Sequence, residues 1–317
     1  MKYIDAEELE KVLTYEDLIP KINDAFAKDY DIPMRHHHQY PNPKEGVEST
    51  LLLMPAWDNG DALGVKIVNV SPNNSKYDLP TIQGLYLYFD LQTGTPKALM
   101  DAKKLTVKRT AAASALASKY LSRADSSKLL VIGTGALSLD LIKAHATVRP
   151  IQEALIWGRS IEKAQAVVDK VDLPGVKATV IESIEEGITQ ADIISCATLS
   201  PTALVLGKYL KPGQHLDMIG AYKPDMREMD DEVLTKVDLY VDNVEGACKE
   251  TGDLAIPLAN GVIQKDDIKA DLFSLARQSH QVSRSAESIT CFKSVGHALE
   301  DLAAANLVFE KTTSDEN

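Results

Sequence analysis

A pair of closely spaced glycines carries the clearest chemical signal in this sequence. Gly133-Thr134-Gly135 follows the apolar run 129–132 and precedes a segment with helical periodicity. One glycine can turn the chain without strain from a Cβ atom, and the other lets the backbone approach a phosphate group. Amide groups at the start of the helix, at Ala136 and Leu137, would donate to a pyrophosphate. The pattern predicts a dinucleotide site, and a glycine turn in an α/β domain that binds no ligand is the alternative.

The residues after the next apolar run bear on which dinucleotide would bind. The run 155–157 is followed by Gly158, Arg159 and Ser160, with Lys163 one turn into the next helix. A site selective for NAD usually places an acidic residue here to bind the ribose 2′-hydroxyl, and this position has none. Arg159, Ser160 and Lys163 instead suit a 2′-phosphate. We therefore expect NADPH, with NADH as the second choice. The alternative is that Arg159 is only a solvent-exposed residue at the start of a helix.

Residues at the ends of two later apolar runs are further candidates. Thr198 and Ser200 come after the run 193–197, and Ile219 ends the run 216–219. Open α/β sheets bind ligands at the carboxyl ends of their strands. These three residues are therefore predicted to contact the ribose or the nicotinamide, although ordinary turn chemistry explains them equally well.

Three cations precede the glycine turn: Arg35, Lys66 and Arg109. Lys66 lies within the apolar segment 63–70, so we expect its ammonium to be buried against a charged partner, such as a ligand carboxylate. Arg35 and Arg109 would suit bidentate binding of the same carboxylate. The sequence thus predicts a site for a small carboxylate. The alternatives are a lysine that reaches solvent from the exposed face of a sheet and an arginine on a helix surface.

No metal site is predicted. The histidines at 36–38 are consecutive, and successive side chains of an extended segment point to opposite faces, so three in a row rarely bind one ion. One of these histidines could instead line the entrance for a substrate. The cysteines Cys196, Cys248 and Cys291 show no metal-ligand spacing.

The elements that would hold these residues fall into two groups. Before residue 128, two short helices are expected over 5–29, and strand and turn signals then alternate as far as residue 101. The expected strands are 49–54, 63–70, 82–90 and 97–101, with hairpin connections at 58–61 and 93–95. We expect a mostly antiparallel sheet, followed by an alanine-rich helix over 104–122.

After residue 128, strands and helices alternate. The expected strands are 129–132, 155–157, 178–181, 193–197, 216–219 and 239–241, with helices at 161–171 and 184–191. This alternation predicts a doubly wound sheet. A long helix within 288–306 is expected to return to the first domain. The fold class is thus α/β, with a Rossmann-type domain over 113–304 and an α+β substrate-binding domain over 1–112, to which 305–317 return.

The composition limits the class of protein. The chain has 317 residues, of which 44% are hydrophobic and 25% charged, and a net charge of −12. That charge, without any basic block, argues against nucleic acid or an anionic membrane as a main partner. No apolar run reaches the roughly 18 residues of a membrane span, and the acidic N-terminus does not resemble a signal peptide. Three widely spaced cysteines suit a reducing cytoplasm, where we expect the protein to work.

Together these residues resemble the ornithine cyclodeaminase/μ-crystallin family over nearly the whole chain. The matching stretches are GVKIVNVSPN at 64–73, LTVKRTAAASALASKYL at 105–121, VIGTGA at 131–136, WGRSIEKA at 157–164, GAYKPDMRE at 220–228 and FKSVGHALED at 292–301. The resemblance implies two domains, of which the outer one forms a homodimer through its sheet. It also implies that Arg35, Lys66 and Arg109 hold a substrate carboxylate, with Lys66 as the catalytic residue, and that Lys293 and Ser294 lie near the nicotinamide.

The family is chemically mixed, and two features of this chain select among its activities. Cyclodeaminases of the family carry an Asp in a G-G-D type turn, whereas the matching tripeptide here is Gly220-Ala221-Tyr222. Their second strand also resembles an NAD-type site, whereas this chain has Gly158-Arg159-Ser160. The resemblance therefore implies an oxidoreductase acting on CH–NH groups. Its reaction would be the reduction of Δ1-pyrroline-2-carboxylate to L-proline, within proline metabolism, or of Δ1-piperideine-2-carboxylate to L-pipecolate.

Three other functions stay open. They are an ornithine cyclodeaminase, an alanine-type amino-acid dehydrogenase and a μ-crystallin-like protein that binds NADPH and a ligand without turnover. The ring size of the imine is open as well, because one methylene is worth only about 1–3 kcal/mol in an apolar pocket. The proton donor to the imine nitrogen is Lys66, Tyr222 or a bound water.

Overall fold

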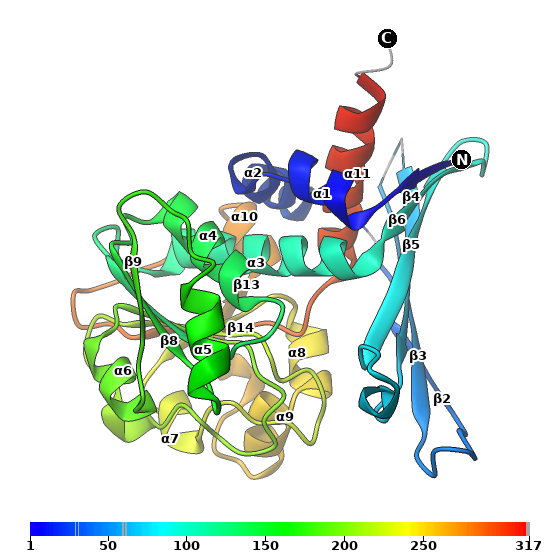
Figure 1. The fold of residues 1–317 in the computed structure, drawn as a ribbon. Coiled ribbons are helices and arrows are strands. Elements are labelled where there is room, and N and C mark those ends of the chain that lie inside the picture. The colour runs from blue at the N-terminus through cyan, green and yellow to red at the C-terminus, as the bar shows by residue number, and fades with distance from the viewer. Residues whose placement is uncertain (29, 31, 59, 61, 315–317) are drawn as a thin grey trace. The chain divides into compact units, whose positions relative to one another are not determined.

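The computed structural model describes residues 1–314 apart from 29, 31, 59 and 61. The chain divides into two compact units (Figure 1). Unit 1 comprises Met1–Arg109 and the C-terminal segment from His297, and unit 2 comprises Thr110–Gly296. We expected the boundaries after residues 112 and 304. The second boundary falls earlier because Glu300 and Asp301 bond to side chains of unit 1.

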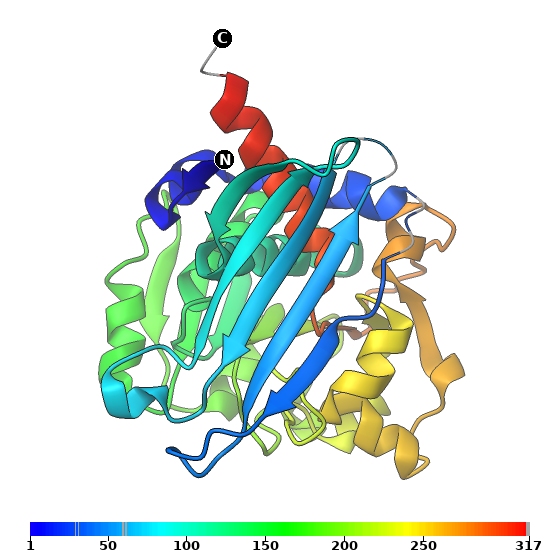
Figure 2. The same ribbon diagram turned by 90° about the vertical axis from the view of Figure 1, so that its right-hand side faces the viewer.

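Unit 1 contains a sheet in the order β1-β6-β5-β4-β3-β2 (Figure 2). Its strands are β1 (Lys2–Ile4), β2 (His36–Tyr40), β3 (Ser49–Trp57), β4 (Ala62–Val70), β5 (Ile82–Asp90) and β6 (Pro96–Asp101). β1 pairs with β6 in parallel, and the other neighbours are antiparallel. The expected antiparallel sheet is confirmed. β1 and β2 were not expected: β1 is very short, and every residue of β2 is exposed. The turn expected at 58–61 includes residues outside the described ones.

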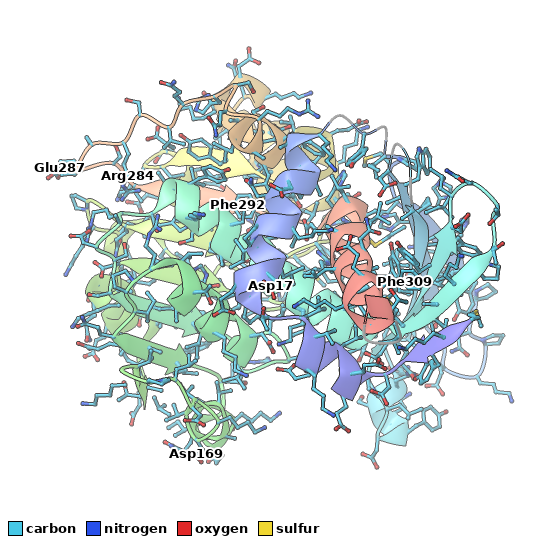
Figure 3. The ribbon with its side chains drawn as sticks, turned by 90° about the horizontal axis from the view of Figure 1, so that it is seen from above. Asp17, Asp169, Arg284, Glu287, Phe292 and Phe309 are labelled. Carbon is cyan, nitrogen blue, oxygen red and sulfur yellow. The ribbon has the colours of Figure 1, made fainter. Side chains whose placement is uncertain are left out.

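Helices cover one face of this sheet. They are α1 (Ala6–Val12), α2 (Tyr15–Ala27), the start of α3 (Ala102–Leu121) and α11 (Ala298–Ser314). α11 packs against β3 and β4, and α2 packs against α11. Phe309 of α11, labelled in Figure 3, has its ring centroid 4.9 Å from that of Tyr88. α11 therefore brings its own side chains to the face of the sheet from which Lys66 projects. No helix in the described part of the chain is long and apolar enough to cross a bilayer.

Unit 2 contains a sheet in the order β13-β12-β14-β11-β10-β7-β8-β9. Its strands are β7 (Lys128–Ile132), β8 (Glu153–Trp157), β9 (Lys177–Val180), β10 (Ile193–Cys196), β11 (His215–Met218), β12 (Asp238–Val241), β13 (Ile268–Asp271) and β14 (Thr290–Lys293). All neighbouring strands are parallel. The expected Rossmann-type sheet is confirmed, and β13 and β14 extend it.

The position of β14 corrects one expectation. It lies inside the stretch 288–306, where we expected a long helix, and that helix begins only at Ala298. The four residues of β14 are all buried. A buried run this short has no periodicity that separates a strand from a helix, so the sequence could not decide.

The strands of unit 2 are apolar because the sheet is buried on both faces. Leu129–Ile132 of β7, for example, are fully buried. The helices of the unit are the rest of α3, α4 (Ser138–Val148), α5 (Ile161–Val168), α6 (Ile184–Gln190), α7 (Asp231–Leu234), α8 (Val244–Glu250), α9 (Gly252–Ala259) and α10 (Leu272–Ala276). Burial on both faces fixes the strand positions and so fixes the loops that follow them.

The register of the strands places their carboxyl ends in one row. Cys196 pairs with Ile132 on one side and with Met218 on the other, and Met218 pairs with Lys293. The chain order of the strands reverses between β7 and β10, which is the position where doubly wound sheets bind a dinucleotide. The predicted cofactor residues follow the strands on either side of this position.

Candidate functional site

The glycine turn after β7 has the geometry that a dinucleotide site requires. Gly133 has φ +124°, and a Cβ atom there would lie 2.8 Å from the carbonyl oxygen of Ala197. Only glycine fits this position without strain. Gly135 is exposed, and a Cβ atom there would meet nothing within 4 Å. The turn therefore has open space on the side that a phosphate would approach.

The amide groups of this turn are available as donors. Among the described residues, the amides of residues 134–137 donate to no acceptor, and Leu137 at the start of α4 has no side-chain cap. Ser138, in place of the third glycine, donates from its hydroxyl to the carbonyl oxygens of Gly133 at 2.9 Å and of Gly135 at 3.1 Å. The serine thus stabilises the turn, and the open amides at the helix N-terminus fit a pyrophosphate.

The end of β8 lies against the same turn. A Cβ atom on Gly158 would be 2.4 Å from Cγ2 of Thr134. Arg159 and Lys163 are exposed. The Ser160 hydroxyl accepts from the amide of Lys163 at 3.2 Å and donates to Glu162 at 2.7 Å. Ser160 therefore caps α5, and Arg159 and Lys163 are the solvent-facing cations at this strand end.

The loops after β10 and β11 are tied together by one buried carboxylate, Glu228. Its Oε1 accepts from the amide of Thr198 at 2.7 Å and from the hydroxyl of Thr198 at 2.9 Å. Its Oε2 accepts from the amides of Gly220 at 2.7 Å and Ala221 at 2.9 Å. The predicted residues Thr198 and Ile219 are thereby positioned, with Ile219 8% exposed. The hydroxyl of Ser200 donates to the carbonyl of Thr202 at 2.6 Å.

Lys293 and Ser294, at the end of β14, bond within the chain. The Lys293 ammonium is fully buried, 2.9 Å from Asp253 Oδ2 and 3.7 Å from Glu228 Oε2. Burial opposes its charge, but Asp253 and Glu228 outweigh that cost and raise the pKa of Lys293. The Ser294 hydroxyl donates to Asp242 at 2.8 Å. Lys293 therefore links the end of β14 to Asp253 and Glu228, and Ser294 links it to Asp242. Lys293 would act on a ligand through these neighbours.

Unit 1 gathers the predicted cations around two acidic residues of α11. The Lys66 ammonium, whose residue is 2% exposed, lies 2.9 Å from Oδ1 and 2.7 Å from Oδ2 of Asp301. Arg109 donates from Nε to Asp301 at 2.9 Å and from Nη1 to Glu300 at 2.6 Å. The alternatives of a solvent-facing Lys66 and a surface Arg109 are therefore wrong. The charged partner expected for Lys66 is a carboxylate of the chain itself.

The electrostatics of this cluster favour a bound anion. Burial, and then the charge of Arg109, lower the pKa of Lys66 to about 8, with Asp301 opposing the shift. Burial also opposes the charge of Arg109, but Asp301 and Glu300 outweigh it and raise the pKa of Arg109. Arg35 is close enough for its charge to act on Lys66. Lys66 and Arg109 are thus matched by two carboxylates, and the charge of Arg35 also acts on Lys66, so the cluster suits the added carboxylate of a ligand.

Four acidic residues complete these clusters and were not predicted: Glu228, Asp253, Glu300 and Asp301. Glu300 and Asp301 stand in an otherwise apolar stretch of α11, and both are fully buried. Charged residues inside an apolar helical run are the signal that could have identified them, because a buried charge needs a partner. No such pattern marks the other two residues, because Glu228 lies in a loop and Asp253 lies at the start of α9.

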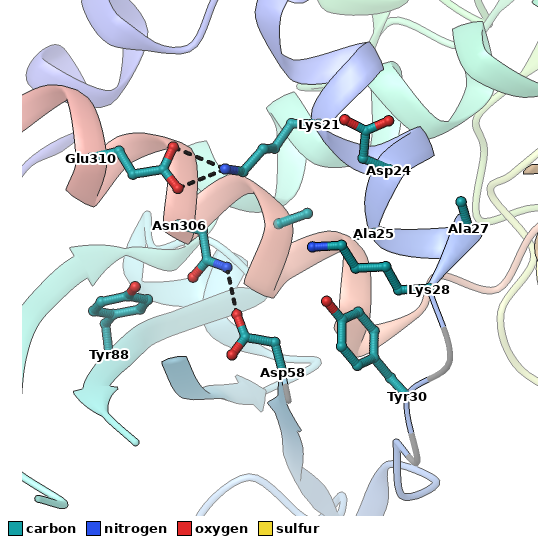
Figure 4. A pocket seen from close by; sticks show the side chains of 11 residues that line it. Lys21, Asp24, Ala25, Ala27, Lys28, Tyr30, Asp58, Tyr88, Asn306 and Glu310 are labelled. Carbon is teal, nitrogen blue, oxygen red and sulfur yellow. Dashed lines mark hydrogen bonds and ion pairs between the residues drawn. The ribbon is translucent and has the colours of Figure 1, made fainter. Parts of the chain in front are cut away.

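Unit 1 also has a cavity of about 460 Å³ near α2 and α11 (Figure 4). Lys21 in this cavity pairs with Glu310 at 2.6 Å, and Asn306 donates to Asp58 at 3.2 Å. None of the predicted site residues is among the described residues that line it. The residues that line the cavity are therefore not those of the cation cluster, and Lys21 and Glu310 are already paired with each other.

Unit 2 has a parallel sheet with a glycine turn and open amides at the dinucleotide position, and unit 1 gathers cations. Together these features are typical of a nicotinamide-dependent oxidoreductase. The sequence model of the ornithine cyclodeaminase/mu-crystallin family matches residues 2–316, and the chain belongs to that family. The resemblance found in the sequence is confirmed.

Named relatives narrow the class further. The Δ1-pyrroline-2-carboxylate reductase of Colwellia psychrerythraea is 36% identical over 98% of this chain and 99% of its own. The structure of the Thermococcus litoralis Δ1-pyrroline-2-carboxylate reductase with NADH and L-proline is 32% identical, with a TM-score of 0.94 over 100% of this chain and 98% of that one. An archaeal alanine dehydrogenase dimer with bound NAD is 29% identical, with a TM-score of 0.92 over 100% and 97%. The two similar structures contain a nicotinamide cofactor, and all three relatives are named for the reduction or dehydrogenation of an imino or amino acid.

Proposed function

We propose that this protein reduces Δ1-pyrroline-2-carboxylate to L-proline with a nicotinamide cofactor, and that it also accepts the six-membered Δ1-piperideine-2-carboxylate. The observation that carries the proposal is the cluster of unit 1, in which the buried cations Lys66 and Arg109, with the charge of Arg35 acting on Lys66, suit the carboxylate of an imino acid. A relative that is 36% identical along the whole chain is named for this reaction. The similar T. litoralis structure holds NADH and L-proline.

Each of the three predicted cations of unit 1 has a role in this reaction. Arg35, Lys66 and Arg109 bind the substrate carboxylate and orient the imine. The bound reduced cofactor supplies the hydride that adds to the C=N carbon. The imine nitrogen must gain a proton, and we assign that proton to Lys66. With its pKa lowered to about 8, the ammonium keeps its proton at neutral pH and releases it more readily than an ordinary lysine. Asp301 holds the ammonium in place.

For the cofactor, we propose that NADPH is preferred and that NADH is also used. Arg159 and Lys163 are exposed at the end of β8, where they suit a 2′-phosphate. Ser160 would bind that phosphate only by giving up its bond to Glu162. The two similar structures contain NADH and NAD, so the proposal concerns the degree of preference in this chain.

We propose that the protein is a homodimer formed through the sheet of unit 1. On the face of the sheet opposite α11, Leu53, Ile67 and Leu85 are cross-strand neighbours and are partly or largely exposed. Figure 2 shows no described element of unit 1 covering this face. Leu85→Glu should lower the molar mass measured by light scattering from two chains to one. Ile161→Glu, at an exposed site in unit 2, should leave it at two chains. A wild-type protein that runs as one chain contradicts the dimer.

We place the enzyme in the cytoplasm, where it would contribute to proline metabolism. Cys196, Cys248 and Cys291 are all free thiols, which suits a reducing compartment. Recovery of the activity in the cytosolic fraction of the source cell would support this location, and recovery only in another fraction would contradict it.

The proposed reaction is tested by following NADPH oxidation at 340 nm with the purified protein. Δ1-pyrroline-2-carboxylate, Δ1-piperideine-2-carboxylate, and pyruvate with ammonia are compared as substrates, each with NADPH and with NADH. We expect the fastest turnover with a cyclic imine and NADPH. Ammonia release from ornithine would instead identify a cyclodeaminase, and turnover only with pyruvate and ammonia would identify an alanine-type dehydrogenase. Tight NADPH binding without any turnover would identify a binding protein.

A further inference from the structure

The cluster of Glu228, Lys293 and Asp253 lies in the half of unit 2 that the glycine turn does not occupy. Glu228 binds the loops after β10 and β11, and Lys293 ends β14. In a doubly wound sheet the glycine turn and the second strand hold the adenosine half of a dinucleotide, so the nicotinamide half belongs to the strands beyond the reversal point. The cluster therefore lies at the nicotinamide half of the sheet.

The hydrogen bonds of Glu228 favour its ionised form. Each of its two oxygens accepts from two donors, which are three backbone amides and the hydroxyl of Thr198. A carboxylate can accept all four bonds, whereas a neutral carboxyl group could donate its hydrogen only to the Thr198 hydroxyl, because amides do not accept there. Burial raises the pKa of Glu228, and Lys293 and the amides of Thr198 and Ala221 oppose the rise.

The cluster carries more negative than positive charge. Glu228 and Asp253 are two fully buried carboxylates, and Lys293 is the one buried ammonium between them. The remaining bonds of Asp253 come from the neutral amides of Glu228 and Met229. Asp242, after β12, is another buried carboxylate, and among the described residues it accepts only from neutral groups, which belong to residues 243 and 294–296.

The cations of the adjoining loop lie nearer to solvent. Lys223 and Arg227 are partly exposed, and Arg227 pairs with Asp231 at 2.6 Å. Solvent screens such charges much more than it screens fully buried ones. The loop therefore reduces the field of the buried carboxylates without cancelling it.

We propose that the negative charge of the Glu228–Lys293–Asp253 cluster selects the oxidised nicotinamide over the reduced one. The oxidised ring is positively charged and the reduced ring is neutral, so a buried negative charge nearby lowers the free energy of the oxidised form. The same charge stabilises the positive charge that develops on the ring as hydride leaves. Glu228 is thus a positioning residue that also sets the local potential. This inference rests on the proposed function only in requiring that the chain binds a nicotinamide cofactor.

The test measures the dissociation constants of NADP+ and of NADPH in the absence of substrate. Both are determined by fluorescence and by calorimetric titration. Glu228→Gln and Asp253→Asn each remove one negative charge from the cluster. Each should weaken the oxidised cofactor relative to the reduced one by roughly tenfold, the order of magnitude for one unit charge inside a protein. Glu228→Asp keeps the charge and should keep the ratio, even if both affinities fall. Glu232→Gln, a partly exposed carboxylate paired with Lys236, is the control and should change neither affinity.

Each possible result either supports or contradicts the inference. Equal losses for both cofactor forms in Glu228→Gln and Asp253→Asn would show that the cluster only holds the loops together, and the inference would be wrong. If one variant does not fold, as judged by its thermal unfolding, the other gives the same test. If the wild-type protein binds neither cofactor form, the proposed function fails. If it binds both and the ratio is insensitive to the cluster, this inference alone fails.

Discussion

The two units each bury a cluster of charged side chains, and the two clusters differ in their balance of charge. In unit 1, Lys66 and Arg109 face Glu300 and Asp301, and the charge of Arg35 also acts on Lys66. In unit 2, the ammonium of Lys293 faces two carboxylates. An imino acid is an anion through its carboxylate, and an oxidised nicotinamide is a cation. The cluster of unit 1 therefore suits the substrate, and the cluster of unit 2 suits the oxidised form of the cofactor.

The two clusters also differ in what their hydrogen bonds hold. In unit 1, side chains bond to side chains, and Nη2 of Arg109 has no acceptor among the described residues. In unit 2, Glu228 bonds mostly to backbone amides, so it fixes the shape of two loops. The first arrangement leaves a donor for a ligand, and the second sets the position of a binding surface. Changes in unit 1 should thus affect catalysis, and changes in unit 2 should affect cofactor binding and stability.

The largest effect is expected from Lys66→Met, which removes a carboxylate ligand and the proposed proton donor at once. Turnover of the imine should fall by about a thousandfold, within the range expected for the loss of a general acid. Cofactor affinity should stay unchanged, because the predicted cofactor residues all belong to unit 2. Steady-state kinetics and a fluorescence titration measure the two quantities. Lys103→Met, at an exposed lysine of α3, is the control and should retain turnover. Undiminished turnover in Lys66→Met would remove Lys66 from the site.

The next largest effect is expected from Gly220→Ala in unit 2. The added Cβ atom would lie 2.1 Å from the carbonyl oxygen of Thr198 and 2.4 Å from Oε1 of Glu228, so the loops must separate. We expect the free energy of unfolding to fall by about 2 kcal/mol, with weaker binding of both cofactor forms. Chemical denaturation measures the loss. Gly246→Ala, where the nearest atom would be 3.5 Å away, should cost much less. Equal stabilities of the two variants would contradict the tight contact at Gly220.

The pH dependence of the reaction tests the cluster of unit 1 further. A pKa lowered to about 8 means that the Lys66 ammonium is present below pH 8 and lost above it. Accordingly, kcat/KM should fall by about tenfold per pH unit above that value. Lys66→Arg keeps a cation that does not titrate in this range, so the decline near pH 8 should disappear, whereas titration of the substrate itself would persist. A wild-type rate that stays flat to pH 10 would contradict the assignment of Lys66.

The smallest effect is expected from Arg159→Ala at the end of β8. It should raise the KM for NADPH by about tenfold and leave the KM for NADH nearly unchanged, because only NADPH carries the 2′-phosphate. Initial rates with each cofactor measure the two constants. Lys170→Ala, an exposed lysine after α5, should change neither. Similar increases in both KM values would remove the argument for NADPH preference.

Local patterns were enough to predict the glycine turn and the strands on either side of it. The strand, the turn and the helix N-terminus at 129–138 are adjacent in the sequence, so their residue types determine their geometry. The burial of Lys66 was also predictable, because its neighbours in the strand are apolar. The role of Ser160 was only partly predictable, since a serine before a helix serves equally as a cap and as a phosphate ligand.

The partners of the cations could not be predicted from local patterns. Lys66 and Asp301 are 235 residues apart in the chain, and only the packing of α11 against β3 and β4 brings them together. The role of Glu228 was equally hidden, because it depends on two loops, after β10 and β11, that meet only when the sheet is complete. Long-range ion pairs of this kind depend on the tertiary fold, whereas hydrophobic periodicity reports local structure.

The most direct test of the proposed reaction follows the hydride itself. The protein is incubated with Δ1-pyrroline-2-carboxylate and NADPH that is deuterated at both C4 positions, and the product is analysed by chiral chromatography and mass spectrometry. We predict L-proline that carries one deuterium at the α-carbon, formed in step with the loss of absorbance at 340 nm. Racemic proline, proline without deuterium, or no proline at all would contradict the account.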